Sequence, residues 1–154
     1  MILSFSFAIL FAYLEYYFIF LDGLPYRNAI EPRMYIFHSY HLFPLIPLLA
    51  FIAFEPLIHQ YLIGSYHNIV KRGILILGFA NFLQALTVND LFYFVFRRIN
   101  PSANDPLAGE WIRQAEWTAQ ILGSINLFGV VFPTWYLITF IIFVPVYLAF
   151  LIAK

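Results

Sequence analysis

The sequence predicts an all-α integral membrane protein, a bundle of four transmembrane helices with an additional interfacial helix. Hydrophobic residues make up 63% of the 154-residue chain and charged residues only 10%, whereas soluble domains carry about a quarter charged residues. The apolar residues gather in stretches of about 20, the length that an α-helix needs to cross the hydrocarbon core. Because the chain is too short for a second domain, we expect residues 1–154 to form a single transmembrane unit.

Each predicted span is an apolar stretch that ends at polar or helix-breaking residues. Asp22 and Gly23 end the first span, which lacks a basic start, so we expect a retained helix and no cleaved signal peptide. Pro56 follows the second span and begins an interfacial piece over residues 57–68. The arginines at 97–98 close the third span. The four predicted spans cover residues 1–21, 34–54, 73–96 and 134–153.

A long polar stretch separates the third and fourth spans. Asp105 stands before a proline, a pair that is typical of a helix start. Trp111 and Trp117 suit the headgroup level of a membrane. We therefore predict a helix that lies at the interface over about residues 107–122. Because glycines interrupt residues 118–133, we favour a re-entrant segment there over a fifth span, and the sequence leaves the choice between the two open.

Four titratable side chains lie inside the predicted spans, where such groups are costly and usually face a partner, a cavity or a metal. Glu15 belongs to the first span, His38 and His41 to the second, and Asp90 to the third. Counting from one membrane face at 1.5 Å per residue places all four at a depth of about 7–12 Å. The two histidines are three positions apart, so they share one helix face.

Two carboxylates and two imidazoles at one depth suit a divalent transition metal such as copper, zinc or iron, whereas calcium would need more oxygen ligands. We therefore predict a metal site formed by Glu15, His38, His41 and Asp90, in a small enzyme or in a subunit of a larger membrane complex. A redox metal would support oxygen chemistry on a small apolar substrate, and zinc a structural or hydrolytic role. The same groups could instead handle protons or a quinone, or could only lock helix packing in an accessory subunit. The sequence leaves open whether the chain is an enzyme.

The third span also carries a polar stripe that leads to its aspartate. Asn81, Gln84 and Thr87 follow one another at three-residue steps toward Asp90. Residues at this spacing share a helix face, so we expect the stripe to be turned inward. Tyr93, in the third span, and Tyr136, in the fourth, are both within reach of the same layer, and the sequence singles out neither.

Composition and motifs exclude several partners and cofactors. The eight basic and eight acidic residues cancel and form no basic run, so nucleic acid is not expected. The chain has no glycine-rich phosphate loop and no histidine pair on facing helices, so neither a nucleotide nor haem is expected. The absence of cysteine excludes disulfides and thiolate metal sites. The expected partners are the lipid bilayer of the plasma membrane and, within it, other membrane subunits or further copies of the chain.

The second half of the chain resembles a family of small uncharacterised polytopic membrane proteins. That family carries, in order, an acidic-Asp-aromatic run, an Asn-Pro, a Trp-His and a Pro-x-x-Tyr. The corresponding features here are the run 89–96, Asn100-Pro101, Trp117 and the segment 133–136. Two positions depart from the pattern, because Asn89 replaces the first acidic residue and Thr118 replaces the histidine. The resemblance implies a polytopic membrane architecture and no particular activity.

A second similarity is to the C-type subunit of copper membrane mono-oxygenases. It is carried by the run Val88-Asn89-Asp90-Leu91-Phe92 and by His38-x-x-His41. The similarity implies a copper site with aspartate and histidine ligands, although the Asp-x-x-x-His spacing of that family is missing here.

Overall fold

The computed structural model describes residues 2–17, 46–63, 68–101, 105 and 107–152. In chain order the elements are α1 (Ile2–Tyr16), α3 (Ile46–Ile63), α4 (Asn68–Ile99), α5 (Trp117–Gln120), β1 (Ser124–Leu127), β2 (Val130–Pro133) and α6 (Thr134–Ile152). The described residues are mostly helical, which confirms the predicted preponderance of helix, and β1 and β2 add a two-stranded antiparallel sheet.

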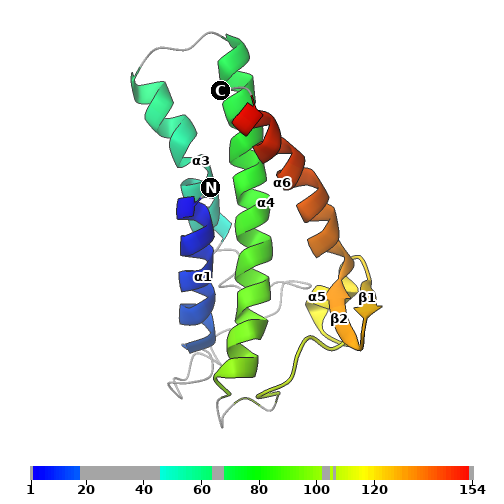
Figure 1. Cartoon of the computed structure of the whole chain (residues 1–154). Helices are drawn as coiled ribbons and strands as arrows, with labels where there is room; N and C mark the ends of the chain where they lie inside the picture. The colour runs from blue at the N-terminus through cyan, green and yellow to red at the C-terminus, as the bar shows by residue number, and fades with distance from the viewer. Residues whose placement is uncertain (1, 18–45, 64–67, 102–104, 106, 153–154) are drawn as a thin grey trace.

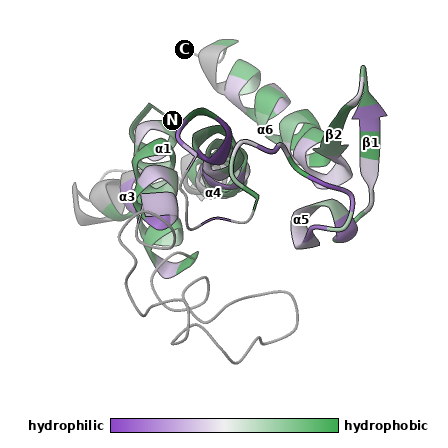
Figure 2. Ribbon diagram, turned by 90° about the horizontal axis from the view of Figure 1, so that it is seen from below, coloured by the Kyte–Doolittle hydropathy of each residue, from purple (hydrophilic) through white to green (hydrophobic). Residues whose placement is uncertain are grey.

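The long helix α4 is the centre of the arrangement (Figure 1). Helices α1 and α3 pack along one side of α4, and α6 leans against its other side (Figure 1). The short helix α5 and the hairpin lie at the start of α6, beside the lower part of α4 (Figure 1). Figure 2 shows the same division from below, with α1 and α3 on one side of α4 and the hairpin on the other.

Only α4, among the described residues, is long and apolar enough to cross a membrane, over Gly73–Ile99. At a rise of 1.5 Å per residue these 27 residues extend for about 40 Å, more than the hydrocarbon core of about 30 Å requires. The other apolar stretches in the described helices are shorter and cover Ile2–Tyr16, Ile46–Glu55 and Thr134–Ala149. The bundle of four spans therefore remains a prediction.

Helix α1 packs closely on α4 because its inward face is made of small residues. Ser4, Ala8 and Ala12 recur at four-residue steps and are all buried. Such a small-residue seam lets two helix backbones approach each other, which is how apolar helices gain van der Waals contact in lipid. Tyr16 continues the seam at its lower end, where its ring meets that of Tyr93 edge to face with a centroid separation of 5.7 Å.

The boundaries of α3 and α4 differ from the predicted spans. Helix α3 continues through Pro56 to Ile63, beyond residue 54, where we predicted the second span to end. A proline removes one backbone hydrogen bond, and an apolar helix tolerates this loss when its neighbours support the bend. Helix α4 begins at Asn68 and takes the charged pair 71–72 into its first turns.

The predicted interfacial helix over residues 107–122 is also wrong, since only Trp117–Gln120 is helical. Asp105 does accept a hydrogen bond from the Leu107 backbone N–H at 2.9 Å, as a helix cap would. The path then reverses at Gly109, whose φ of +80° is left-handed, a conformation that ends helices.

The segment that we interpreted as re-entrant is a β-hairpin over its second half. Ser124 pairs with Pro133 and Leu127 with Val130, in an antiparallel register. The two turn residues, Phe128 and Gly129, have φ of 54° and 84°, as tight two-residue hairpin turns require. The usual turn signal is Asn-Gly or Asp-Gly, and a phenylalanine in the first position hides it.

Candidate functional site

The polar stripe of α4 is turned inward, as we expected, and it meets matching side chains on α6, which the sequence did not predict. The Tyr147 hydroxyl contacts Oδ1 of Asn81 at 2.7 Å and also Oε1 of Gln84. One turn or so further along α4, the hydroxyls of Thr87 and Thr139 lie 2.6 Å apart. The partners on α6 come in reverse order because α6 runs antiparallel to α4. We call this row of interhelical hydrogen bonds the α4–α6 seam.

Asp90 ends the seam and draws three elements together. Its Oδ2 atom accepts hydrogen bonds from Oγ1 of Thr118 in α5 and from the hydroxyl of Tyr136 in α6, both at 2.5 Å. Hydroxyl donors that are bonded to a carboxylate form short, charge-assisted hydrogen bonds. The arrangement holds the carboxylate in one orientation and ties the start of α6 to α4.

Thr118 is itself held in place by Trp135. It is fully buried, and the indole N–H of Trp135 donates to its carbonyl oxygen at 3.1 Å and lies 3.2 Å from its Oγ1 atom. Trp135 packs against its neighbour Tyr136 with a ring separation of 4.6 Å. Trp135 therefore helps to position both donors to Asp90, because it bonds Thr118 and packs against Tyr136.

The negative charge of Asp90 has no cationic partner within the described part of the chain. Its side chain is partly exposed, and both of its hydrogen bonds end on Oδ2, so that Oδ1 is without one among the described residues. Arg97 lies two turns further along α4, but its guanidinium is bonded to Glu116. A carboxylate in apolar surroundings is costly unless a counter-charge or a proton balances it. Asp90 is thus an oriented acceptor whose charge is not balanced by any cation among the described residues.

Arg97 organises the loop that covers the end of α4. Its Nη2 and Nη1 atoms contact the two oxygens of Glu116 at 2.9 and 3.2 Å. The same side chain donates to the carbonyls of Glu110 at 3.1 Å and of Trp111 at 2.9 Å. These carbonyls are turned toward the guanidinium and not along a helix axis. This explains why residues 107–116 form turns where we predicted a helix.

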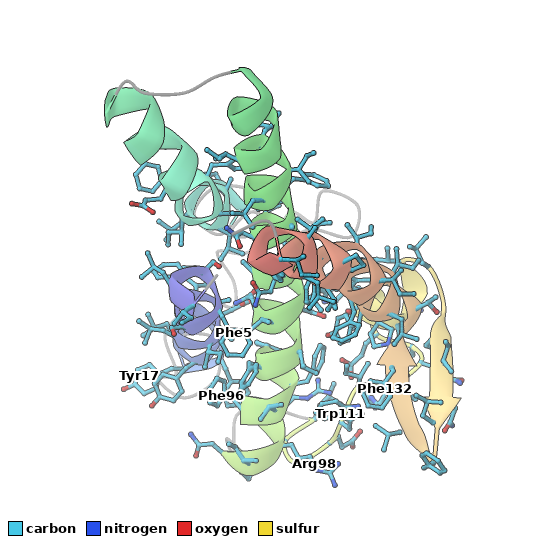
Figure 3. The ribbon with its side chains drawn as sticks, turned by 45° about the horizontal axis from the view of Figure 1, so that its top comes forward. Phe5, Tyr17, Phe96, Arg98, Trp111 and Phe132 are labelled. Carbon is cyan, nitrogen blue, oxygen red and sulfur yellow. The ribbon has the colours of Figure 1, made fainter. Side chains whose placement is uncertain are left out.

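The β1–β2 hairpin packs against the loop of residues 107–116. The Trp111 indole N–H donates to the Val131 carbonyl at 2.9 Å. Its ring lies 6.2 Å from that of Phe132, and Figure 3 shows the two side chains near each other below α6. Below α4, Arg98 points away from the other labelled side chains (Figure 3) and is exposed.

The structure locates two of the four predicted metal ligands. Glu15 lies in the last turn of α1, in electrostatic range of the Tyr93 hydroxyl, one turn beyond Asp90 on α4. His38 and His41 lie outside the described residues. Within the described ranges, no group of three or more histidine, cysteine, aspartate or glutamate side chains is placed to hold a metal ion. The four-residue site therefore stays a prediction.

The structure adds Thr118 and Tyr136 to the surroundings of Asp90. The sequence pattern placed Tyr136 within reach of the polar layer but did not identify Thr118 as a partner. The one signal for Thr118 was positional, since residue 118 is where the resemblance places a histidine. Tyr136 is the tyrosine of the Pro-x-x-Tyr pattern.

The chain matches no protein-family model, no curated protein and no solved structure.

Proposed function

We propose that this chain is an integral membrane protein in which Asp90 anchors a cation site, with a divalent transition metal as its ligand. The state of the Asp90 carboxylate supports this proposal. Two hydroxyls orient one oxygen, the other oxygen has no hydrogen bond among the described residues, and no described cation balances the charge. Binding a cation would remove the cost of keeping this charge in apolar surroundings.

The outer surface of the helices supports the membrane placement. Large apolar side chains are exposed on α1, α4 and α6, including Leu3, Leu10, Leu75, Ile76, Phe79, Phe140, Ile141 and Leu148. Soluble monomers seldom expose contiguous apolar patches beyond a few hundred Å². Lipid would cover these side chains, and α4 is long enough to cross the bilayer. The plasma membrane is the membrane that we propose.

Glu15, His38 and His41 would supply the remaining ligands. Glu15 lies in the last turn of α1, in electrostatic range of Tyr93, which is one helical turn from Asp90, and this placement favours its inclusion. Imidazole and carboxylate together suit copper, zinc or iron. Such an ion would act as a Lewis acid or a redox centre, according to its identity. The residues of this chain would hold it, and Thr118 and Tyr136 would orient its aspartate ligand.

Elemental analysis of the purified protein tests the proposal. The protein in detergent, and metal-free protein that has been reloaded with copper, zinc or iron in turn, should each retain about one ion per chain. Asp90→Asn, which keeps the size of the side chain and removes its charge, should lose the ion. The control Glu110→Gln changes an exposed carboxylate and should retain it. If the wild-type chain holds no ion in any of these preparations, the cation site is wrong.

A second candidate is an accessory subunit whose polar layer only joins helices, and the α4–α6 seam favours it. Hydrogen bonds with Tyr147, Thr139 and Tyr136 account for every step of the α4 stripe without any ligand. In this case Asp90→Asn would lower the thermal stability of the protein while the wild type contains no metal. Other polypeptides would also co-purify with the chain in native gels.

A further inference from the structure

We propose that the β1–β2 hairpin is a membrane anchor that places its apolar face and its Phe128 tip in the lipid interface. This inference rests on the membrane placement in the proposed function and is independent of the cation site. Three hairpin side chains carry it. Ile125 is 38% exposed, Leu127 is 42% exposed and Phe128, at the turn, is completely exposed.

The hairpin has two faces of different character. Residues that are directly opposite in an antiparallel pair project from the same face of the sheet, and side chains alternate along each strand. Ile125 and Leu127 therefore share a face with their partners Phe132 and Val130. All four are apolar, whereas the opposite face carries the polar Ser124 and Asn126. Ile125 and Leu127 are the exposed members, while Val130 and Phe132 are partly buried and Phe132 also meets the Trp111 ring. This face is the one we assign to lipid.

The charge distribution fits a lipid partner better than an aqueous one. From Trp117 to Ala153 the chain contains no acidic and no basic residue. The hairpin continues without a break into α6, whose outer side chains Leu137, Ile138 and Ile141 are also exposed. The apolar surface of the hairpin is thus continuous with the helix surface that lipid would cover.

The position of the hairpin sets its depth. Tyr136, three residues after β2 ends, reaches Asp90, which precedes Arg97 by seven residues. At 1.5 Å per residue this junction lies about 10 Å inward from Arg97 along α4. Figure 1 shows the hairpin beside the lower part of α4. It therefore lies at the boundary between headgroups and acyl chains, where Trp135 would also be favoured.

The same depth satisfies the hairpin backbone. Unpaired N–H and C=O groups at the edge of a sheet do not occur where hydrocarbon surrounds them. At the interface, water and headgroups can bond these edges while the side chains reach the acyl chains, as interfacial amphipathic helices do. We therefore place the hairpin side chains, and not its backbone, in the apolar layer.

Phe128 gives an independent reason to expect a partner. Its φ of 54° is left-handed, a conformation that glycine and asparagine adopt far more readily than a bulky residue. An aromatic ring at this position is both strained and completely exposed. Contact with lipid would offset both costs, whereas contact with water would offset neither.

Because the chain contains no cysteine, a single introduced cysteine can be labelled specifically. Single cysteines at Phe128, Ile125, Ile141 and Gln114 carry a nitroxide label, and the protein is reconstituted in phosphatidylcholine vesicles. Electron paramagnetic resonance then measures how accessible each label is to oxygen, which concentrates in lipid, and to a water-soluble nickel chelate. Ile141 is an exposed α6 residue and Gln114 an exposed loop residue, so they serve as lipid and water controls. The variant labelled at position 125 retains the native Phe128 at the turn.

We expect the labels at 128 and 125 to favour oxygen over the chelate, at a shallower depth than the label at 141, and the label at 114 to favour the chelate. If 128 and 125 behave like 114 while 141 lies in lipid, the anchor is wrong and the membrane placement stands. If 141 also favours the chelate, the membrane placement of the proposed function fails. If 128 and 125 are shielded from both reagents, a second copy of the chain covers the hairpin and lipid is not its partner.

Discussion

Replacement of Arg97 by methionine should destabilise the protein far more than the same change at Arg113, which lies in the covering loop, residues 107–116. The Arg97 side chain is 4% exposed and its partner Glu116 is 13% exposed. Methionine keeps an apolar stem but removes the guanidinium, whose Cζ lies 4.6 Å from the centroid of the Phe94 ring, and it leaves the largely buried Glu116 carboxylate with only the half-exposed Arg113 as a cation. Breaking such a pair costs about 3–5 kcal/mol. The carbonyls of Glu110 and Trp111 lose their donors as well, so we expect a value near the upper end.

Arg113→Met is the matched control. Arg113 contacts Glu110 at 3.5 Å and Glu116 at 3.6 Å, and its side chain is 50% exposed. Exposed pairs of this kind contribute about 0–1 kcal/mol because water screens them. Removal of both partners in Arg97→Met/Glu116→Leu should recover part of the stability, since an apolar pair carries no uncompensated charge.

The measurement is the free energy of unfolding in mixed micelles, obtained by titration with a denaturing detergent. Circular dichroism follows the helices, and tryptophan fluorescence reports on Trp111 beside the Arg97 contact. Equal losses of stability in Arg97→Met and Arg113→Met would contradict a buried ion pair at the end of α4. The same conclusion would follow if Arg97→Met/Glu116→Leu were as unstable as the sum of its two single changes.

Three further changes test the packing and the seam. Gly78→Ala should lower the free energy of unfolding by about 1–3 kcal/mol, because its new Cβ would lie 2.5 Å from the Phe54 ring of α3. Adding Phe54→Leu, which has a smaller side chain, should restore stability. A Gly78→Ala protein as stable as wild type would contradict this packing. Tyr147→Phe removes the hydroxyl between two α4 amides and should cost about 0.6–1.7 kcal/mol in lipid, which thermal unfolding of reconstituted protein can resolve; no loss would show that the seam is not formed. Tyr136→Phe leaves Asp90 with one hydroxyl donor and should lower metal retention in elemental analysis while the protein stays folded, and unchanged retention would remove Tyr136 from the site.

The helical periodicity of α4 made its polar stripe predictable. Asn81, Gln84 and Thr87 are spaced by one helical turn, so local geometry alone puts them on one face, and all three are buried. Their partners were a different matter. Tyr147 and Thr139 are 66 and 52 residues away from Asn81 and Thr87 in the chain, and no local pattern determines which face of α6 meets α4.

The covering loop shows why a good local signal can fail. Asp105 caps a first turn as its sequence context predicts, yet Arg97 takes two carbonyls that a continuing helix would need. The guanidinium is buried and must satisfy its donors, and this demand outweighs the modest helix propensity of the loop. The hairpin was not predicted because its turn carries Phe128 where a hairpin turn usually has asparagine or aspartate.

The sequence by itself determined the apolar character of the helices, the place of the apolar stretch within α4 and the inward direction of its polar stripe. These properties depend on composition and on spacing within about 20 residues, and both are visible in one linear stretch of chain. Tertiary structure alone decided that Thr118 and Tyr136 meet at one oxygen of Asp90, 28 and 46 residues away in sequence. Such a meeting depends on how the elements pack, because packing selects among the many faces that local pattern leaves equivalent.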